Sequence, residues 1–205
     1  DVAEDGTVVN SGTFYVRPDA PTHLLCYPEM CFIKAEVLFR QGQTNPAFDA
    51  YKEGIRAHME LMNEKLVGYN DPVNISKQPM TSTEINDYLS SAAVGTAADL
   101  TLGKIMMQKF IALSFSNQNW NDMRRLDYSP TIYRGWAEPY ERTSGNNDKR
   151  WIPDGKQYRR LGYVSHEFNY NNANLEASHP HALLDDIRSF PVWWDYPTDD
   201  YKSAN

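Results

Sequence analysis

Two pairs of adjacent carboxylates are the residues in this sequence best suited to acid–base chemistry. They are Asp185 with Asp186 and Asp199 with Asp200. Enzymes that hydrolyse glycosidic bonds place two carboxyl groups on either side of the scissile bond. Neighbouring residues on a helix point about 100° apart, so neither pair presents both carboxyl groups to one bond. The sequence therefore disfavours a glycan-processing enzyme, and we expect a protein without catalytic activity.

The histidines and cysteines form no recognisable metal or cofactor motif. His179 and His181 flank one proline, but no third ligand follows at the spacing of a zinc site. Cys26 and Cys31 fall on different faces of an expected helix, so a mutual disulfide is awkward and two small buried side chains are expected. Phosphate-loop, H-E-x-x-H and G-x-S-x-G motifs are absent from the sequence. We predict no cofactor and no metal, and leave a structural calcium ion open.

An aromatic-rich segment, residues 127–163, is the best candidate for ligand binding. It is rich in Pro, Gly, Asn, Arg and aromatic residues and has no helical period. A loop this long is usually functional or a partner contact. Sugars lay their apolar faces on aromatic rings, while nearby polar groups bind their hydroxyls. The predicted ligand contacts are Trp136, Tyr133, Tyr140 and Trp151.

Trp136 is the favoured contact, because Gly135 beside it lets the backbone turn and present the ring outward. The alternative is that two or more of the four aromatics are buried under the loop as a satellite core.

The overall composition excludes several classes of protein. The chain has 205 residues, 41% of them hydrophobic, which suits a single domain with a sizeable core. The net charge is -7 and no basic stripe is present, so we exclude a nucleic-acid partner. No apolar run approaches the roughly 20 residues of a membrane-spanning helix. The chain lacks a signal peptide and opens on a strand-and-turn passage. We therefore expect a fragment, with any lipid-attachment cysteine upstream.

Helical periodicity predicts a helical hairpin over residues 28–66. The first helix runs from Pro28 to Gly42, with a polar face of Glu29, Glu36 and Arg40. Its two apolar rows are Met30, Ile33 and Val37, and Cys31, Ala35 and Leu38. The second helix carries an apolar row of Phe48, Tyr51, Ile55, Met59, Met62 and Leu66. The short connection predicts antiparallel packing, as in a tetratricopeptide-type pair.

Further helices are expected along the rest of the chain. Thr81 and Glu84 suit a capping box for a helix ending near Leu89. Residues 99–126 predict two helices, at 100–115 with Asp99 as the cap and at 118–126. The tail predicts an extended passage at 157–163, a helical one at 165–177 and a short helix near 181–187. The predicted fold is mainly α, with long irregular loops and a few short strands.

Four sequence patches, in series, resemble one known family. The first is YPEMCFIKAEVLFRQG followed by AFDAYKEGIRAHME, at residues 27–60, and the second is LGKIMMQKFIALSFSNQNWNDMRRLDY, at 102–128. The third is YRRLGYVSHEFNYN, at 158–171, and the fourth is VWWD, at 192–195. Their content, order and spacing resemble the C-terminal part of SusD/RagB-like nutrient-binding proteins. Val164 departs from this pattern, because the family often has proline there.

The resemblance implies a mainly α-helical lipoprotein on the outer surface of the outer membrane. Such a protein captures glycan or peptide and hands it to a SusC-like TonB-dependent transporter, and only an upstream lipid anchor joins it to the membrane. The signature residues are expected to hold the fold rather than to bind cargo. They are Trp120, Asp122, Arg124, Arg125, Glu167 and Asn171. The alternative is a helical-repeat scaffold that binds only proteins through an exposed row of side chains.

Overall fold

The computed structural model describes residues 22–67, 79–114, 116–136, 156–192 and 195. These residues are helical or irregular, and no β-strand occurs among them, so the few short strands of the predicted fold are not found there. The residues up to Asn119 belong to one compact unit, and those from Trp120 to Asp200 form another. The mainly α fold predicted from the sequence is confirmed.

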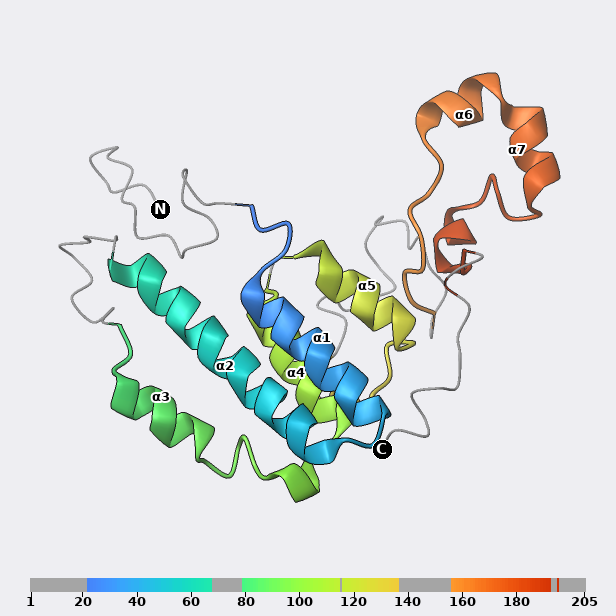
Figure 1. The fold of residues 1–205 in the computed structure, drawn as a ribbon. Helices are drawn as coiled ribbons and strands as arrows, with labels where there is room; N and C mark the ends of the chain where they lie inside the picture. Colours follow the sequence, from blue (N-terminus) through green and yellow to red (C-terminus); the bar gives the residue numbers. More distant parts are fainter. Residues whose placement is uncertain (1–21, 68–78, 115, 137–155, 193–194, 196–205) are drawn as a thin grey trace, which may run out of the picture. The chain divides into compact units, whose positions relative to one another are not determined.

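The first unit is built on an antiparallel helix pair. Helix α1 spans Tyr27–Arg40 and α2 spans Thr44–Val67, and the two lie side by side (Figure 1). Gly42, with a φ of 75°, closes α1: its N–H donates to Phe39 and that of Gln43 to Leu38, each at 2.9 Å. This is a Schellman motif with glycine at the left-handed position. The predicted hairpin over residues 28–66 is therefore confirmed, while its likeness to tetratricopeptide repeats stays a prediction.

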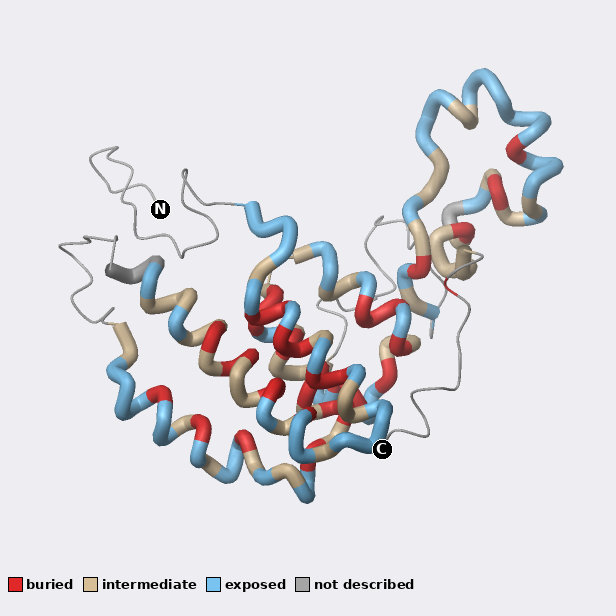
Figure 2. The backbone as a smooth tube through the Cα atoms, viewed as in Figure 1, coloured by how far each residue is buried: buried red, intermediate tan, exposed pale blue. Residues whose placement is uncertain are grey.

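The core of this unit lies where α1, α2 and α4 face one another (Figure 2). Phe32 on α1 is fully buried and meets Tyr51 of α2 edge to face, with 6.4 Å between ring centroids. Tyr51 and Ile55 are buried as predicted, and Phe48 and Met59 pack partly buried against the same core. The α2 row therefore serves packing, which is the opposite of the exposed row that a scaffold would need.

The inward face of α1 was predicted only in part: Cys31 and Ala35 of one expected apolar row are buried, but the other row and the polar face depart from the prediction. Met30 and Val37 are 46% and 47% exposed, whereas Glu29 and Glu36 are buried at 6% and 7%. Lys109 is also buried, on helix α4, which packs against α1. Burial of a charged group is tolerated when it is paired, and Glu36 forms an ion pair with Arg40 at 2.9 Å.

Two shorter helices complete the first unit. Helix α3, Ser82–Leu89, begins with the predicted capping box between Thr81 and Glu84. A 3-10 turn, η1, spans Ala97–Asp99 and precedes α4, Leu102–Ala112. The cap of α4 is Thr101, whose hydroxyl accepts from the N–H of Lys104, so the prediction of Asp99 as the cap was wrong. Asp99 closes the preceding turn on Thr96 and pairs with Lys104 at 2.8 Å.

The second unit is less regular. Helix α5, Asn117–Arg125, contains the boundary between the units, and α6, Ser165–Tyr170, α7, Asn172–Ser178, and the 3-10 turn η2, Asp185–Ser189, follow. The helical passage predicted at 165–177 is thus two helices meeting at Asn171. Most of α6 and α7 is exposed (Figure 2). In the described ranges of both units, no helix is long and apolar enough to cross a bilayer.

Candidate functional site

The site is built on an unusual turn at the end of α5. The N–H of Tyr128 donates to Met123 at 2.8 Å and that of Asp127 to Arg124 at 3.0 Å, which is a second Schellman motif. Here the left-handed residues are not glycines: Asp127 has a φ of 54° and Tyr128 a φ of 50°. Such conformations cost about 1–3 kcal/mol each in residues with a Cβ and persist only when surrounding contacts hold them.

Arg159 supplies contacts that hold this turn. Its guanidinium forms an ion pair with Asp127 and donates from Nη1 to the carbonyl of Arg124 at 3.0 Å. Arg124 donates in return to the carbonyl of Arg159 at 2.9 Å, and Asp195 Oδ1 lies 3.4 Å from Arg159 Nη1. Arg124, Asp127, Arg159 and Asp195, hereafter the Arg159 cluster, thus join residues more than 60 positions apart in the chain.

Asp195 is the most deeply buried carboxylate of the Arg159 cluster. It is 5% exposed, and its Oδ2 makes no hydrogen bond within the described part of the chain. Burial raises the pKa of Asp195 above its ordinary value, and the nearby Arg159 and Arg124 offset this only in part. One guanidinium therefore serves two carboxylates, of which Asp127 has the closer contact.

Aromatic rings adjoin the Arg159 cluster. The Tyr128 hydroxyl donates to the carbonyl of Tyr158 and accepts from Trp120 Nε1 at 2.9 Å. The Arg124 guanidinium lies over the Trp120 ring, 4.0 Å from its centroid. The Tyr128 ring lies 5.7 Å from that of Trp136, at an interplanar angle of 41°. Tyr128 and Trp136, hereafter the aromatic pair, are thus two neighbouring rings. The hydrogen bonds of the Tyr128 hydroxyl with Trp120 and Tyr158 hold the first ring in place.

The predicted ligand residues fall in three environments. Trp136 is half-buried in the aromatic pair and follows Gly135, whose φ of 78° is left-handed, so the predicted turn is present. Tyr133 is only 2% exposed and therefore packs inside the unit, which removes its side chain from ligand contact. Tyr140 and Trp151 lie outside the described residues.

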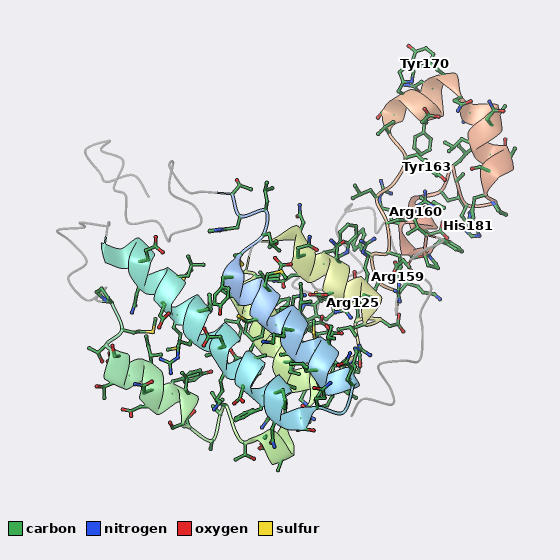
Figure 3. All side chains as sticks on the ribbon, viewed as in Figure 1. Arg125, Arg159, Arg160, Tyr163, Tyr170 and His181 are labelled. Carbon is green, nitrogen blue, oxygen red and sulfur yellow. The ribbon has the colours of Figure 1, made fainter. Side chains whose placement is uncertain are left out.

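The signature residues make local and long-range contacts. Arg125 donates from Nε and Nη2 to Asp122 Oδ1, at 3.2 and 2.8 Å, an ion pair within the last turn of α5. The Asn171 amide donates to Glu167 Oε2 at 2.7 Å, so these two residues bond each other across one helical turn. Figure 3 labels Arg125, Arg159 and Arg160 in this unit. The structural roles expected of these residues stay a prediction.

Sequence reasoning missed Tyr128, Arg159, Asp127 and Asp195 as site residues. Three of the quoted patches contain them, and each patch carries a charge opposite to that of another: arginine at 159, aspartate at 127 and at 195. These opposite charges were the one signal in the sequence that could have indicated contacts between the three patches.

A second ring cluster lies near η2. His179 and His181 face Phe190, with centroid distances of 4.9 and 4.6 Å, and His181 Nδ1 lies 2.8 Å from Asp186 Oδ2. No group of three metal-ligating side chains occurs within the ranges that the structure describes.

Comparison with known proteins assigns the family. A family model named SusD-like, described as starch-binding associating with outer membrane, matches residues 3–163, more than three quarters of the chain. The chain belongs to this SusD-like family. No curated protein and no solved structure gives a significant match to it. The SusD-like family is described by what it binds and by its association with the outer membrane, and its description names no reaction.

Proposed function

We propose that this SusD-like chain is part of a lipid-anchored cell-surface protein that captures glycan outside the cell. It would deliver the glycan to a SusC-like TonB-dependent transporter without breaking a bond in it. The observation that carries the proposal is the match to a starch-binding, outer-membrane-associated family over residues 3–163. Peptide cargo is the alternative within the same mode of action.

The aromatic pair is the proposed contact for the glycan. Two rings held 5.7 Å apart offer neighbouring apolar faces, and Trp136 retains exposed surface. Apolar faces of sugar rings stack on such surfaces, with about 1 kcal/mol gained beyond simple burial. Arg134 beside the pair is exposed and carries the polar donors that hydroxyl groups require.

Binding of the 205-residue chain to soluble starch and to maltooligosaccharides, measured by affinity electrophoresis and calorimetry, tests the proposal. Trp136→Ala is expected to raise Kd about fivefold or more, which corresponds to about 1 kcal/mol. Tyr170→Ala is the matched control, since Tyr170 is an aromatic of the same unit that is 79% exposed on α6. Undiminished starch binding by the Trp136 variant would contradict the assignment of this surface. Binding of a peptide digest but of no glycan would favour peptide cargo.

Exposed apolar residues on α1 and in the segment just before it favour an additional protein contact. Leu24, Leu25, Tyr27, Met30 and Val37 are all between 46% and 89% exposed. Apolar patches of this kind on a soluble protein mark interaction surfaces. We propose that these residues meet protein rather than glycan. Coexpression with the transporter and cross-linking from residue 30 would test the contact, which fails if cross-links form equally from a cysteine placed at Glu60.

A further inference from the structure

The turn that carries Tyr128 lacks the glycine that usually holds such a turn. At the end of α1 the same Schellman motif uses Gly42, which adopts a positive φ freely. At the end of α5 the equivalent position is Asp127, and the following residue, Tyr128, is bulky and also left-handed. A large side chain in that region is an outlier that outside contacts must hold.

Arg159, which lies 32 residues later in the chain, supplies contacts that hold Asp127. The ion pair fixes the Asp127 side chain, and the bond from Arg159 Nη1 to the Arg124 carbonyl fixes the last turn of α5. Arg159 is itself held, because its backbone N–H donates to the Arg188 carbonyl at 2.8 Å. The backbone of Arg159 is therefore held in place, and its guanidinium contacts the turn from that position.

The conformation of the turn decides where the Tyr128 ring lies. With φ positive at both residues, the Tyr128 hydroxyl reaches Trp120 and the Tyr158 carbonyl, and the ring lies against Trp136. If the backbone relaxed to negative φ, the Tyr128 side chain would leave in another direction, and Trp136 would lose its neighbour. The ion pair and the aromatic pair are linked through two backbone angles, and the Arg159 guanidinium also lies over the Tyr128 ring, 5.8 Å from its centroid.

We propose that Arg159 is a positioning residue that sets the aromatic pair by holding Asp127 in the left-handed turn. Its role in binding rests on the proposed function, whereas its effect on the geometry of the rings does not. Arg159 need not touch the glycan. Replacing it should weaken glycan binding about as much as Trp136→Ala does, about fivefold.

Fluorine NMR of the 205-residue chain labelled with 5-fluorotryptophan measures the geometry without any ligand. The chain has five tryptophans, and the resonance that disappears in Trp136→Phe identifies Trp136. Arg159→Gln and Asp127→Ala are both expected to shift this resonance, because each removes the ion pair and alanine disfavours the positive φ of position 127. Arg160→Gln is the control: this neighbouring arginine lies over Tyr163, at 4.8 Å from the ring centroid, and is expected to leave the resonance in place.

Rescue separates positioning from general stabilisation. In the double variant Arg159→Gln with Asp127→Gly, glycine adopts the left-handed turn without an ion pair. The Trp136 resonance should return toward its original position, and maltooligosaccharide affinity should recover with it. If Arg159 mattered only through Asp195 or through overall stability, glycine at position 127 would restore neither.

Each outcome bears on the proposal. A folded Arg159→Gln variant with an unshifted Trp136 resonance overturns it, as does a shifted resonance that the glycine does not restore. Unfolding of both single variants also overturns it, since the ion pair would then hold the whole unit and not one turn. A shift with rescue, but without any glycan binding by the unmodified chain, supports positioning and refutes the proposed function instead.

Discussion

Gly54→Ala tests how closely α1 and α2 approach. A Cβ at position 54 would lie 2.9, 2.9 and 3.0 Å from three atoms of the Phe32 ring, where ordinary carbon contacts are about 3.5–4.0 Å. The ring is fully buried, so it has little room to move. Overpacking a core costs about 1–3 kcal/mol, whereas replacing glycine by alanine in a helix contributes about 1 kcal/mol. With three close contacts on a rigid ring, we expect the clash to win by about 1 kcal/mol.

Urea unfolding followed by circular dichroism measures this difference, together with a fall in Tm of about 2–4 °C for a chain of this size. The same substitution in a Phe32→Leu background should have the opposite sign. Leucine lacks the outer ring atoms that clash, so the helix preference of alanine then dominates and stabilises by up to about 1 kcal/mol. The cycle should give a coupling free energy of about 2 kcal/mol between the two positions. Stabilisation by Gly54→Ala in both backgrounds would refute close packing at this crossing.

Two further predictions concern the same helices. Ile55→Asp should unfold the first unit, because Ile55 is 3% exposed and a buried unpaired carboxylate costs several kcal/mol. Met30→Asp, at a 46% exposed position, should change Tm little. Equal effects of the two substitutions on Tm would contradict the assigned buried and exposed faces. Burial lowers the pKa of His58 below its ordinary value of 6.5, so its contribution to stability is full above pH 6.5 and is lost as pH falls through that value toward the folded-state pKa. His58→Gln should therefore flatten the fall in unfolding free energy between pH 7.5 and 5.5, and an unchanged slope would show that other groups cause it.

The sequence predicted much of the fold because its signals are local. The capping box at Thr81 and Glu84 and the spacing of Tyr51 and Ile55 act within one or two helical turns, and the structure confirms them. The prediction for the buried face of α1 was only partly right, because both sides of that helix carry apolar residues. The choice depends on α4, which packs against α1 from some 70 residues away in sequence. No local period contains that information.

The candidate site was less predictable for a related reason. The motifs around Trp120, Arg159 and Asp195 were visible one by one, but their convergence depends on contacts between residues more than 30 positions apart. Tyr128 gave no signal, because a tyrosine after a helix does not suggest a left-handed backbone. Tyr133 and Trp136 have similar surroundings in the sequence, yet only their packing separates a buried ring from an accessible one.

Because Arg159 contacts two carboxylates, the residue at which a recombinant form of this protein ends matters. The family match stops at residue 163, which would suggest a natural end point for expression. Asp195 and the Arg188 carbonyl that anchors Arg159 both lie beyond that point. A chain shortened to residue 163 would keep Trp136 and Tyr128, but one side of Arg159 would be exposed to solvent. Loss of binding by such a shortened form would say nothing about which rings touch the cargo.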